Sequence, residues 1–241
     1  MSSRELEAER LTQLEKDTTR KTTSFKLQSY WNTLIHILNG SVAFCLTVFL
    51  IKEVKNGWPS TRDIFPLHAF LCAIGYQLFM AEAILVFYAP NSWSYFLSYK
   101  IKRHLHWILQ LFGAIFIICG NFIAIVIRTT PLFATIHGIS GLISMILLVI
   151  TILQGVCVYF AYDLRSYVKP MTSRFVHNCV SVLCFLIGMF SLVVGYGYGS
   201  DYGVFDTKII EYSLIVIAVV TTVFSIVGAV KSELQYILRK D

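Results

Sequence analysis

Long apolar stretches alternate with short polar ones along most of the chain. Six of the apolar stretches are long enough to cross the hydrocarbon core of a bilayer, which takes about 20 residues. They predict helices at Trp31–Ile51, Leu67–Tyr88, Leu105–Ile127, Leu132–Phe160, Phe175–Tyr198 and Ile209–Val230. The fourth is long, and we expect it to tilt or to extend beyond the lipid. The pattern predicts an all-α, polytopic membrane protein.

The composition supports this fold class. Of the 241 residues, 56% are hydrophobic and only 14% are charged, which excludes an ordinary soluble domain. The net charge of +6 is a record of membrane orientation, so no nucleic-acid partner is expected. All six cysteines fall inside apolar stretches and form no CxxC pair. They are interpreted as small buried hydrophobic residues rather than as disulfides or metal ligands.

Lys and Arg are unevenly distributed between the connecting segments. Fifteen of the 20 lie in four segments, residues 1–29, 89–104, 161–174 and 231–241. The positive-inside rule places these segments, and therefore both termini, in the cytosol. The N-terminal segment shows no cleavable signal. We therefore expect a cytosolic arm at 1–29 that is partly disordered or amphipathic, a six-span domain at 30–230 and a cytosolic tail at 231–241.

Four histidines stand near the beginnings of their spans: His68, His106, His137 and His177. A polar ring in lipid is costly, so such residues usually face a partner or a cofactor. Consecutive spans run in opposite directions, so depth sorts the four into two pairs. His68 and His137 should lie near the non-cytosolic face, and His106 and His177 near the cytosolic face.

Two pairs at two depths suit two haems, each held between two imidazoles. Neutral imidazole is a good iron ligand. Because both axial positions would be filled, no site is left for oxygen, which favours electron transfer. The prediction is a dihaem core made by the second to fifth spans.

Glycine spacing gives a second argument for the same interpretation. Each of the four histidines has a glycine at an offset of 7, 11 or 18 residues on its own span, which nearly returns to the same helix face. A flat macrocycle between helices needs such space free of side chains. The alternative is that the glycines only let the helices pack closely.

The remaining polar residues of the spans carry weaker expectations. His104 should project from nearly the opposite face to His106, and His36 is interpreted as hydrogen-bonded rather than as a ligand. Glu82 is expected to pair with a cation of the Lys100–Arg103 cluster, or to be an interfacial carboxylate with no specific role. Arg128 is either an anion-binding residue or an interface anchor. The sixth span should contain no buried charge.

Several stretches resemble the cytochrome b561 family, particularly its short b561 domain-containing transmembrane reductases. They are Phe65-Pro66-Leu67-His68, Glu82–Phe87, Leu105–Leu111, His137-Gly138 with Gly141, and His177. The resemblance implies that the equivalent histidines ligate two b-type haems, second span to fourth and third to fifth. This agrees with the pairing by depth. Because no CxxCH motif exists, the two haem b groups should be non-covalent.

The resemblance also implies an activity. Members take electrons from cytosolic ascorbate and reduce monodehydroascorbate or ferric iron, supplied as a chelate, across the lipid bilayer. The residues expected to receive the ascorbate anion are Lys100, Lys102, Arg103, Arg165 and Arg174. Each of them is alternatively a plain topology determinant. An endomembrane location, in the endoplasmic reticulum or cytoplasmic vesicles, is implied, with the plasma membrane as the alternative; a homodimer is left open.

Two competing functions remain at this stage. A haem-free six-span scaffold or transporter would use the histidines as buried polar contacts, and an optical spectrum separates it from a cytochrome. A quinone-linked respiratory cytochrome commonly places two ligands on one helix. Here each candidate ligand has its own helix, which argues against that class.

Overall fold

The structure, a computed structural model, describes residues 3–55, 65–88, 93–127, 134–199, 205 and 207–238. All regular structure in these ranges is helical. The elements are α1 (Ser3–Lys55), α2 (Phe65–Ala73), the π-helix η1 (Ile74–Met80), α3 (Ala81–Leu85), α4 (Tyr99–Ile127), α5 (Ile136–Tyr159), α6 (Pro170–Tyr196) and α7 (Lys208–Leu238). They provide six helices long and apolar enough to span a membrane, which confirms the predicted fold class.

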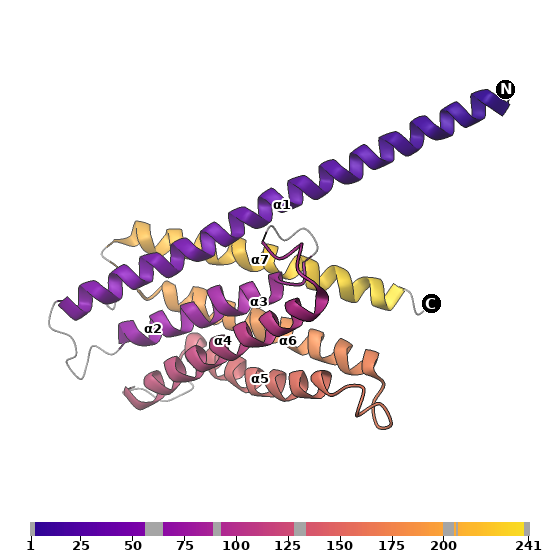
Figure 1. The fold of residues 1–241 in the computed structure, drawn as a ribbon. Coiled ribbons are helices and arrows are strands. Elements are labelled where there is room, and N and C mark those ends of the chain that lie inside the picture. The colour runs from indigo at the N-terminus through magenta and orange to yellow at the C-terminus, as the bar shows by residue number, and fades with distance from the viewer. Residues whose placement is uncertain are drawn as a thin grey trace.

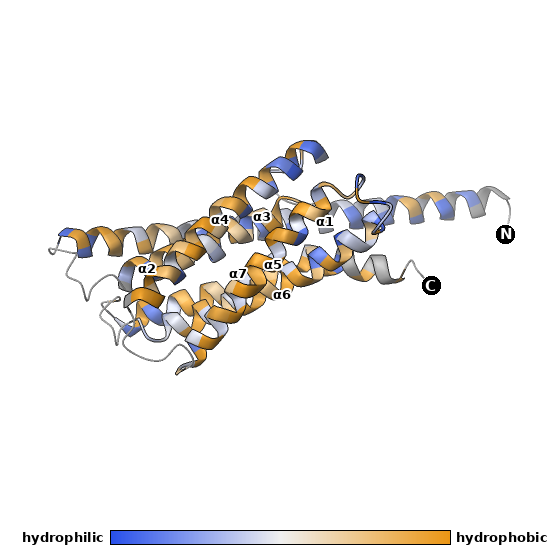
Figure 2. Ribbon diagram, turned by 90° about the horizontal axis from the view of Figure 1, so that it is seen from below, coloured by the Kyte–Doolittle hydropathy of each residue, from blue (hydrophilic) through white to orange (hydrophobic). Residues whose placement is uncertain are grey.

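The spans form one bundle in which both chain ends lie at the same end (Figure 1). In Figure 2 apolar residues dominate the helices of the bundle, whereas the projecting part of α1 is largely hydrophilic. Large side chains such as Phe44, Phe122 and Val126 are exposed on the outside. An apolar exterior is expected where lipid is the solvent. The core contains fully buried Phe185 and Ile117, so the bundle is also packed internally.

The second span departs from the predicted regular helix. It consists of α2, η1 and α3, so a seven-residue π-helical segment occupies its middle. The wider turns place two polar side chains inside the bundle. The Tyr76 hydroxyl donates to Ser144 Oγ at 2.9 Å, and Gln77 Oε1 accepts from the Tyr196 hydroxyl at 3.0 Å. The Tyr76 ring lies directly over Gly188, where any Cβ would clash. Such π-helical insertions are frequent at functional sites.

The N-terminal arm is a helical continuation of the first span. Helix α1 runs without a break from Ser3 to Lys55 and projects beyond the bundle (Figure 1). The side chains from Arg10 to Leu27 are exposed. The sequence has no Gly or Pro before Gly40, so nothing in it interrupts the helix. Residues 3–29 are therefore helical in the structure, and the partly disordered or amphipathic character expected for this arm stays a prediction.

Two expectations about buried residues were wrong. Glu211, in the sixth span, is only 2% exposed, and Lys208 Nζ lies 3.3 Å from its Oε2 one turn earlier in α7. The cation offsets part of the cost of burying the carboxylate. All six cysteines are free, but Cys119, Cys157 and Cys179 are exposed on the outside of the bundle. Lipid accepts a thiol as readily as the core does, so an apolar stretch does not distinguish the two positions.

Candidate functional site

The four histidines of the second to fifth spans lie in two pairs. The outer pair is His68 of α2 and His137 of α5, with ring centroids 5.9 Å apart and planes at 79°. The inner pair is His106 of α4 and His177 of α6, with centroids 6.5 Å apart and planes at 82°. Two imidazoles that bind one metal from opposite sides, each through a bond of about 2 Å, have centroids about 6 Å apart. Both pairs have this spacing.

Backbone carbonyls orient both rings of the outer pair. Nδ1 of His68 lies 2.8 Å from the Gly120 carbonyl oxygen, and Nδ1 of His137 lies 2.9 Å from that of Ser191. A carbonyl can only accept, so we assign the proton to Nδ1 in each ring. Nε2 then keeps its lone pair for a metal, which is the usual arrangement of a ligating histidine.

The inner pair is held less completely. Nδ1 of His106 lies 2.8 Å from the Ala83 carbonyl oxygen, and the Phe87 ring lies 5.2 Å from the imidazole. Nδ1 of His177 is buried and makes no hydrogen bond of good geometry within the described part of the chain, although the Thr151 backbone lies beside it. One ring of this pair is therefore fixed by a carbonyl and the other mainly by packing.

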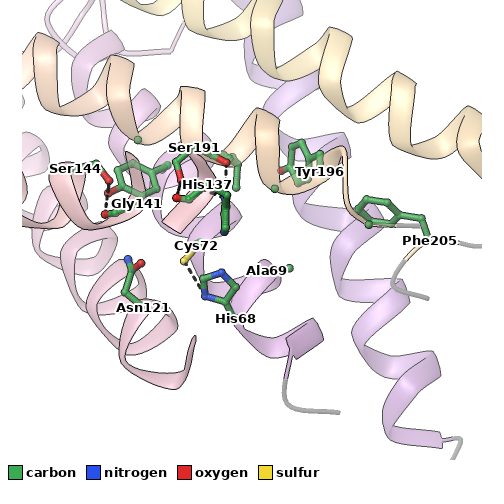
Figure 3. A pocket seen from close by; sticks show the side chains of 15 residues that line it. His68, Ala69, Cys72, Asn121, His137, Gly141, Ser144, Ser191, Tyr196 and Phe205 are labelled. Atoms are coloured by element: carbon green, nitrogen blue, oxygen red, sulfur yellow. Dashed lines mark hydrogen bonds between the residues drawn. The ribbon is translucent and has the colours of Figure 1, made fainter. Parts of the chain in front are cut away.

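A cavity opens at the outer pair. Its empty space, including the open mouth, is about 580 Å³. His68 and His137 face each other across it, and the sulfur of Cys72 lies 3.6 Å from Nδ1 of His68 (Figure 3). The lining also contains small residues, Gly141 and Ser191 among them. The lining of the cavity thus combines small residues with two imidazoles whose orientation is fixed by backbone carbonyls.

The glycines serve both purposes that the sequence left open. A Cβ at Gly195 of α6 would lie 2.9 Å from Cε1 of His137, and one at Gly155 of α5 would lie 3.4 Å from Cε1 of His177. These two glycines clear space beside a histidine, but on the neighbouring helix rather than on the histidine's own. Gly75 and Gly113 instead face each other's backbone across η1 and α4, so they allow close helix packing.

The sequence led us to expect that Glu82 pairs with the Lys100–Arg103 cluster or has no specific role. Neither expectation is correct, because its carboxylate has other partners. One carboxylate oxygen lies 2.7 Å from Nδ1 of His36, and the other accepts a hydrogen bond from Trp93 Nε1 at 3.4 Å. The first span packs against the second, so its histidine reaches the carboxylate. This contact confirms that His36 is hydrogen-bonded. His104 also behaves as expected, since its Nδ1 lies 2.7 Å from the Lys100 carbonyl of its own helix.

The five candidate cations lie at the bundle end that carries the inner pair and both termini. Lys100, Lys102 and Arg103 begin α4, Arg165 lies between α5 and α6, and Arg174 is in the first turns of α6. The Arg103 guanidinium lies 5.4 Å from the centre of the Tyr159 ring, a cation–π contact that joins α4 to the end of α5. Arg128 lies outside the described residues.

The residues present fit a haem better than a metal bound by protein alone. Within the described ranges, no three His, Cys, Asp or Glu side chains gather as a metal site. Each histidine pair offers two ligands, so a metal there must bring the rest of its coordination with it. Haem iron does so, and it takes histidine as its axial ligand.

Comparison with known proteins agrees with this site. The family model described as eukaryotic cytochrome b561 matches residues 67–200, a range that includes all four paired histidines. The chain is similar to the protein named transmembrane reductase CYB561D2 of Homo sapiens, with 26% identity over 158 residues, 64% of this chain and 68% of the relative. The proteins of the same name from Bos taurus and Mus musculus are 27% and 25% identical over the same shares. The chain belongs to the cytochrome b561 family.

Proposed function

We propose that this protein transfers electrons across the membrane through two non-covalent haem b groups. The donor is cytosolic ascorbate, and the acceptor on the other side is monodehydroascorbate or a ferric chelate. Family membership supports transmembrane electron transfer in a multi-pass membrane protein. The name of the similar proteins, transmembrane reductase, supports the direction from donor to reduced acceptor.

The observation that carries the proposal is the placement of two histidine pairs at two levels of one bundle. On α4, His106 belongs to the inner pair and Gly120 holds the outer pair. These 14 residues correspond to about 21 Å of helix at 1.5 Å per residue. The hydrocarbon core is about 30 Å thick. Two sites at this separation divide the distance that an electron must cross into shorter steps. A single site near one face would leave most of the thickness to be crossed in one step.

Each chain element has a defined task in this proposal. His68 and His137 hold one haem, and His106 and His177 hold the other. The carbonyls of Gly120, Ser191 and Ala83 fix the tautomers that leave Nε2 free to bind. Haem bound in this way supplies a reversible one-electron carrier with no open coordination position for oxygen.

The donor end is defined by charge. The cations listed above provide a fixed positive field at the level of the inner pair, and such a field raises the local concentration of an anion such as ascorbate. Tyr159 holds the Arg103 guanidinium in place. With both termini at this end, the proposal places it in the cytosol. We further propose an endomembrane location, as the family resemblance implies.

Proteoliposomes test the function directly. Ascorbate is added on the side of the termini, a ferric chelate is enclosed on the other, and haem absorbance and ferrous product are followed together. The proposal predicts a reducible b-type spectrum and ferrous iron inside the vesicles. Protease added outside should cut both termini when they face it. A colourless protein, or termini on opposite faces, would favour a scaffold or transporter instead.

A further inference from the structure

A second cavity lies outside the four helices of the histidine pairs, between α1, α3 and α7. Its empty space, including the mouth, is about 590 Å³. Leu85 lines it from α3, whereas the carbonyl of Ala83, two residues earlier, holds His106 of the inner pair. The α3 backbone therefore stands between this cavity and the inner pair, so the cavity is not part of the haem site.

An amide with no hydrogen-bond partner among the described residues lines this cavity. Asn32 of α1 is only 4% exposed, and both Nδ2 and Oδ1 are buried with no hydrogen-bond partner in the described part of the chain. Asn32 lines the cavity. A buried amide with neither its donor nor its acceptor satisfied is costly, and more so at membrane depth. A ligand that offers both an acceptor and a donor would remove this cost.

The polarity of the walls changes along the cavity. Gln28 of α1 and Lys231, which ends the sixth span, lie at the end nearer the chain termini. Asn32 is about one turn deeper than Gln28. Beyond it the walls are apolar, with Ile35 and Leu85 among them. The Trp31 ring, one residue before Asn32, stacks on the Phe224 ring with centroids 5.6 Å apart and planes within 7°. From mouth to base the cavity offers a cation, then an amide, then hydrocarbon surface.

We propose that this cavity binds one anionic phospholipid. Its phosphate would face Lys231, the oxygens and hydroxyls of its glycerol and head group would satisfy Asn32, and an acyl chain would follow the apolar base. The order of these groups in the lipid matches the order of the walls, and the cation stands at the end of the sixth span, where a span meets the polar head groups. A bound lipid would join the first span to the sixth, two helices outside the haem core.

The test uses the full-length, haem-loaded protein stripped of lipid in detergent. Phosphatidylinositol, phosphatidylcholine and inorganic phosphate are added separately, and thermal stability and native mass spectra are recorded. Phosphatidylinositol should raise the melting temperature and give a one-to-one adduct, because a ligand that binds only the folded protein stabilises it. The proposal would be overturned if phosphatidylcholine or phosphate alone stabilised the protein as much as phosphatidylinositol does. It would also be overturned if none of the three stabilised it.

Three variants locate the site. Lys231→Gln should weaken phosphatidylinositol binding by about fivefold to tenfold, because it removes one cation near the surface. Asn32→Leu should abolish the adduct, while the lipid-free variant stays at least as heat-stable as the wild type, since an unpaired amide is replaced by an apolar side chain. Asn39→Leu is the matched control.

Asn39 is suited to that role because it shares the residue type and the burial of Asn32 but does not line the cavity. It lies seven residues further along α1, is 1% exposed, has no partner among the described residues, and does not line the cavity. Its variant should keep the lipid adduct. If Asn39→Leu loses the adduct as Asn32→Leu does, or if Asn32→Leu keeps it, the site is wrong. The haem spectrum verifies the fold of every variant.

Discussion

The outer and inner histidine pairs have the same ligands but different supports. Both rings of the outer pair are held by backbone carbonyls, and Ser191 adds a hydroxyl 3.3 Å from Nδ1 of His137. In the inner pair His106 has such a carbonyl, whereas His177 has the Thr151 backbone beside it without a hydrogen bond of good geometry in the described part of the chain. The outer pair also has less clearance, since a Cβ at Gly195 would lie 2.9 Å from His137, whereas one at Gly155 would lie 3.4 Å from His177.

This difference shows that ligand identity and ligand support are separate properties. The partners of a ligating histidine set its orientation and basicity, so two haems with identical axial ligands can differ in potential and in tolerance of substitution. The outer pair should respond sharply to small changes around it. The inner pair should respond more to the charges at its end of the bundle. The following predictions test that contrast.

The largest effect is expected from removing one ligand of each pair. His68→Ala and His106→Ala should each lose about one of two haems, because an axial ligand is removed. His106→Ala should lose rapid reduction by ascorbate from the cytosolic side. His68→Ala should keep inner-haem reduction but deliver no electrons across the membrane. Haem absorbance and ferrous product in proteoliposomes distinguish the two.

Each variant must first be shown to retain its other haem. Transfer across the membrane at the wild-type rate by His68→Ala would show that the outer pair is not in the relay. If neither variant reduces its remaining haem, the pairing itself would need revision.

A methyl group at each glycine should affect the two pairs unequally. Gly195→Ala forces the His137 ring to move, and overpacking of this kind costs about 1–3 kcal/mol. Gly155→Ala makes an ordinary contact with His177 and should be nearly neutral. Haem content and the heat at which each haem is released measure the effect. Equal sensitivity of the two sites would remove the proposed difference in clearance.

A smaller effect is expected from the charges of the donor end. Arg103→Gln should raise the KM for ascorbate a few-fold and leave haem content intact, because one fixed cation of a cluster is lost. The ratio of the variant's KM to the wild-type KM should fall toward one at high salt, because salt screens the field of the cations. Lys55→Gln is the control and should leave KM unchanged. Lys55 ends α1, at the end of the bundle away from the N-terminus and the Lys100–Arg103 cluster. An unchanged KM in Arg103→Gln would make that residue a topology determinant only.

The smallest effect is expected at Ser191. Ser191→Ala keeps the carbonyl that holds His137 but removes the hydroxyl near Nδ1. Loss of this weak acceptor makes the imidazole less electron-donating, so the midpoint potential of the outer haem should rise by on the order of tens of millivolts. The inner haem of the same molecule is the control. A redox titration that shifts both haems equally would show a general effect on the bundle.

The sequence predicted the spans and the level of each histidine because both depend on depth alone. Apolar length locates each span, and the alternation of direction places His68 level with His137 and His106 level with His177. Neither step needs any knowledge of which helices touch. The tertiary contacts that the structure adds, such as the carbonyl of Gly120 beside His68, follow from that arrangement.

Features that depend on lateral packing could not be predicted in this way. Glu82 has cations nearby in sequence but His36 nearby in space, because the first span packs on the second. The π-helix of the second span arises where Tyr76 and Gln77 find partners on other helices. The contacts of Gly195 with His137 and of Gly155 with His177 cross from one helix to the next, so they also depend on lateral packing. Hydrophobic patterning predicts how deep each residue lies in the membrane. It does not predict which face of a helix contacts which neighbouring helix.

The central claim is that each histidine pair holds one haem, and the haem content of the purified protein tests it most directly. Haem is measured as its pyridine complex against the amount of protein chain, and then again after extraction with acid and acetone. The account predicts about two haem b per chain in the first measurement, all of it extracted in the second because no CxxCH attachment motif is present. One haem per chain, none, or pigment that stays with the protein would contradict it.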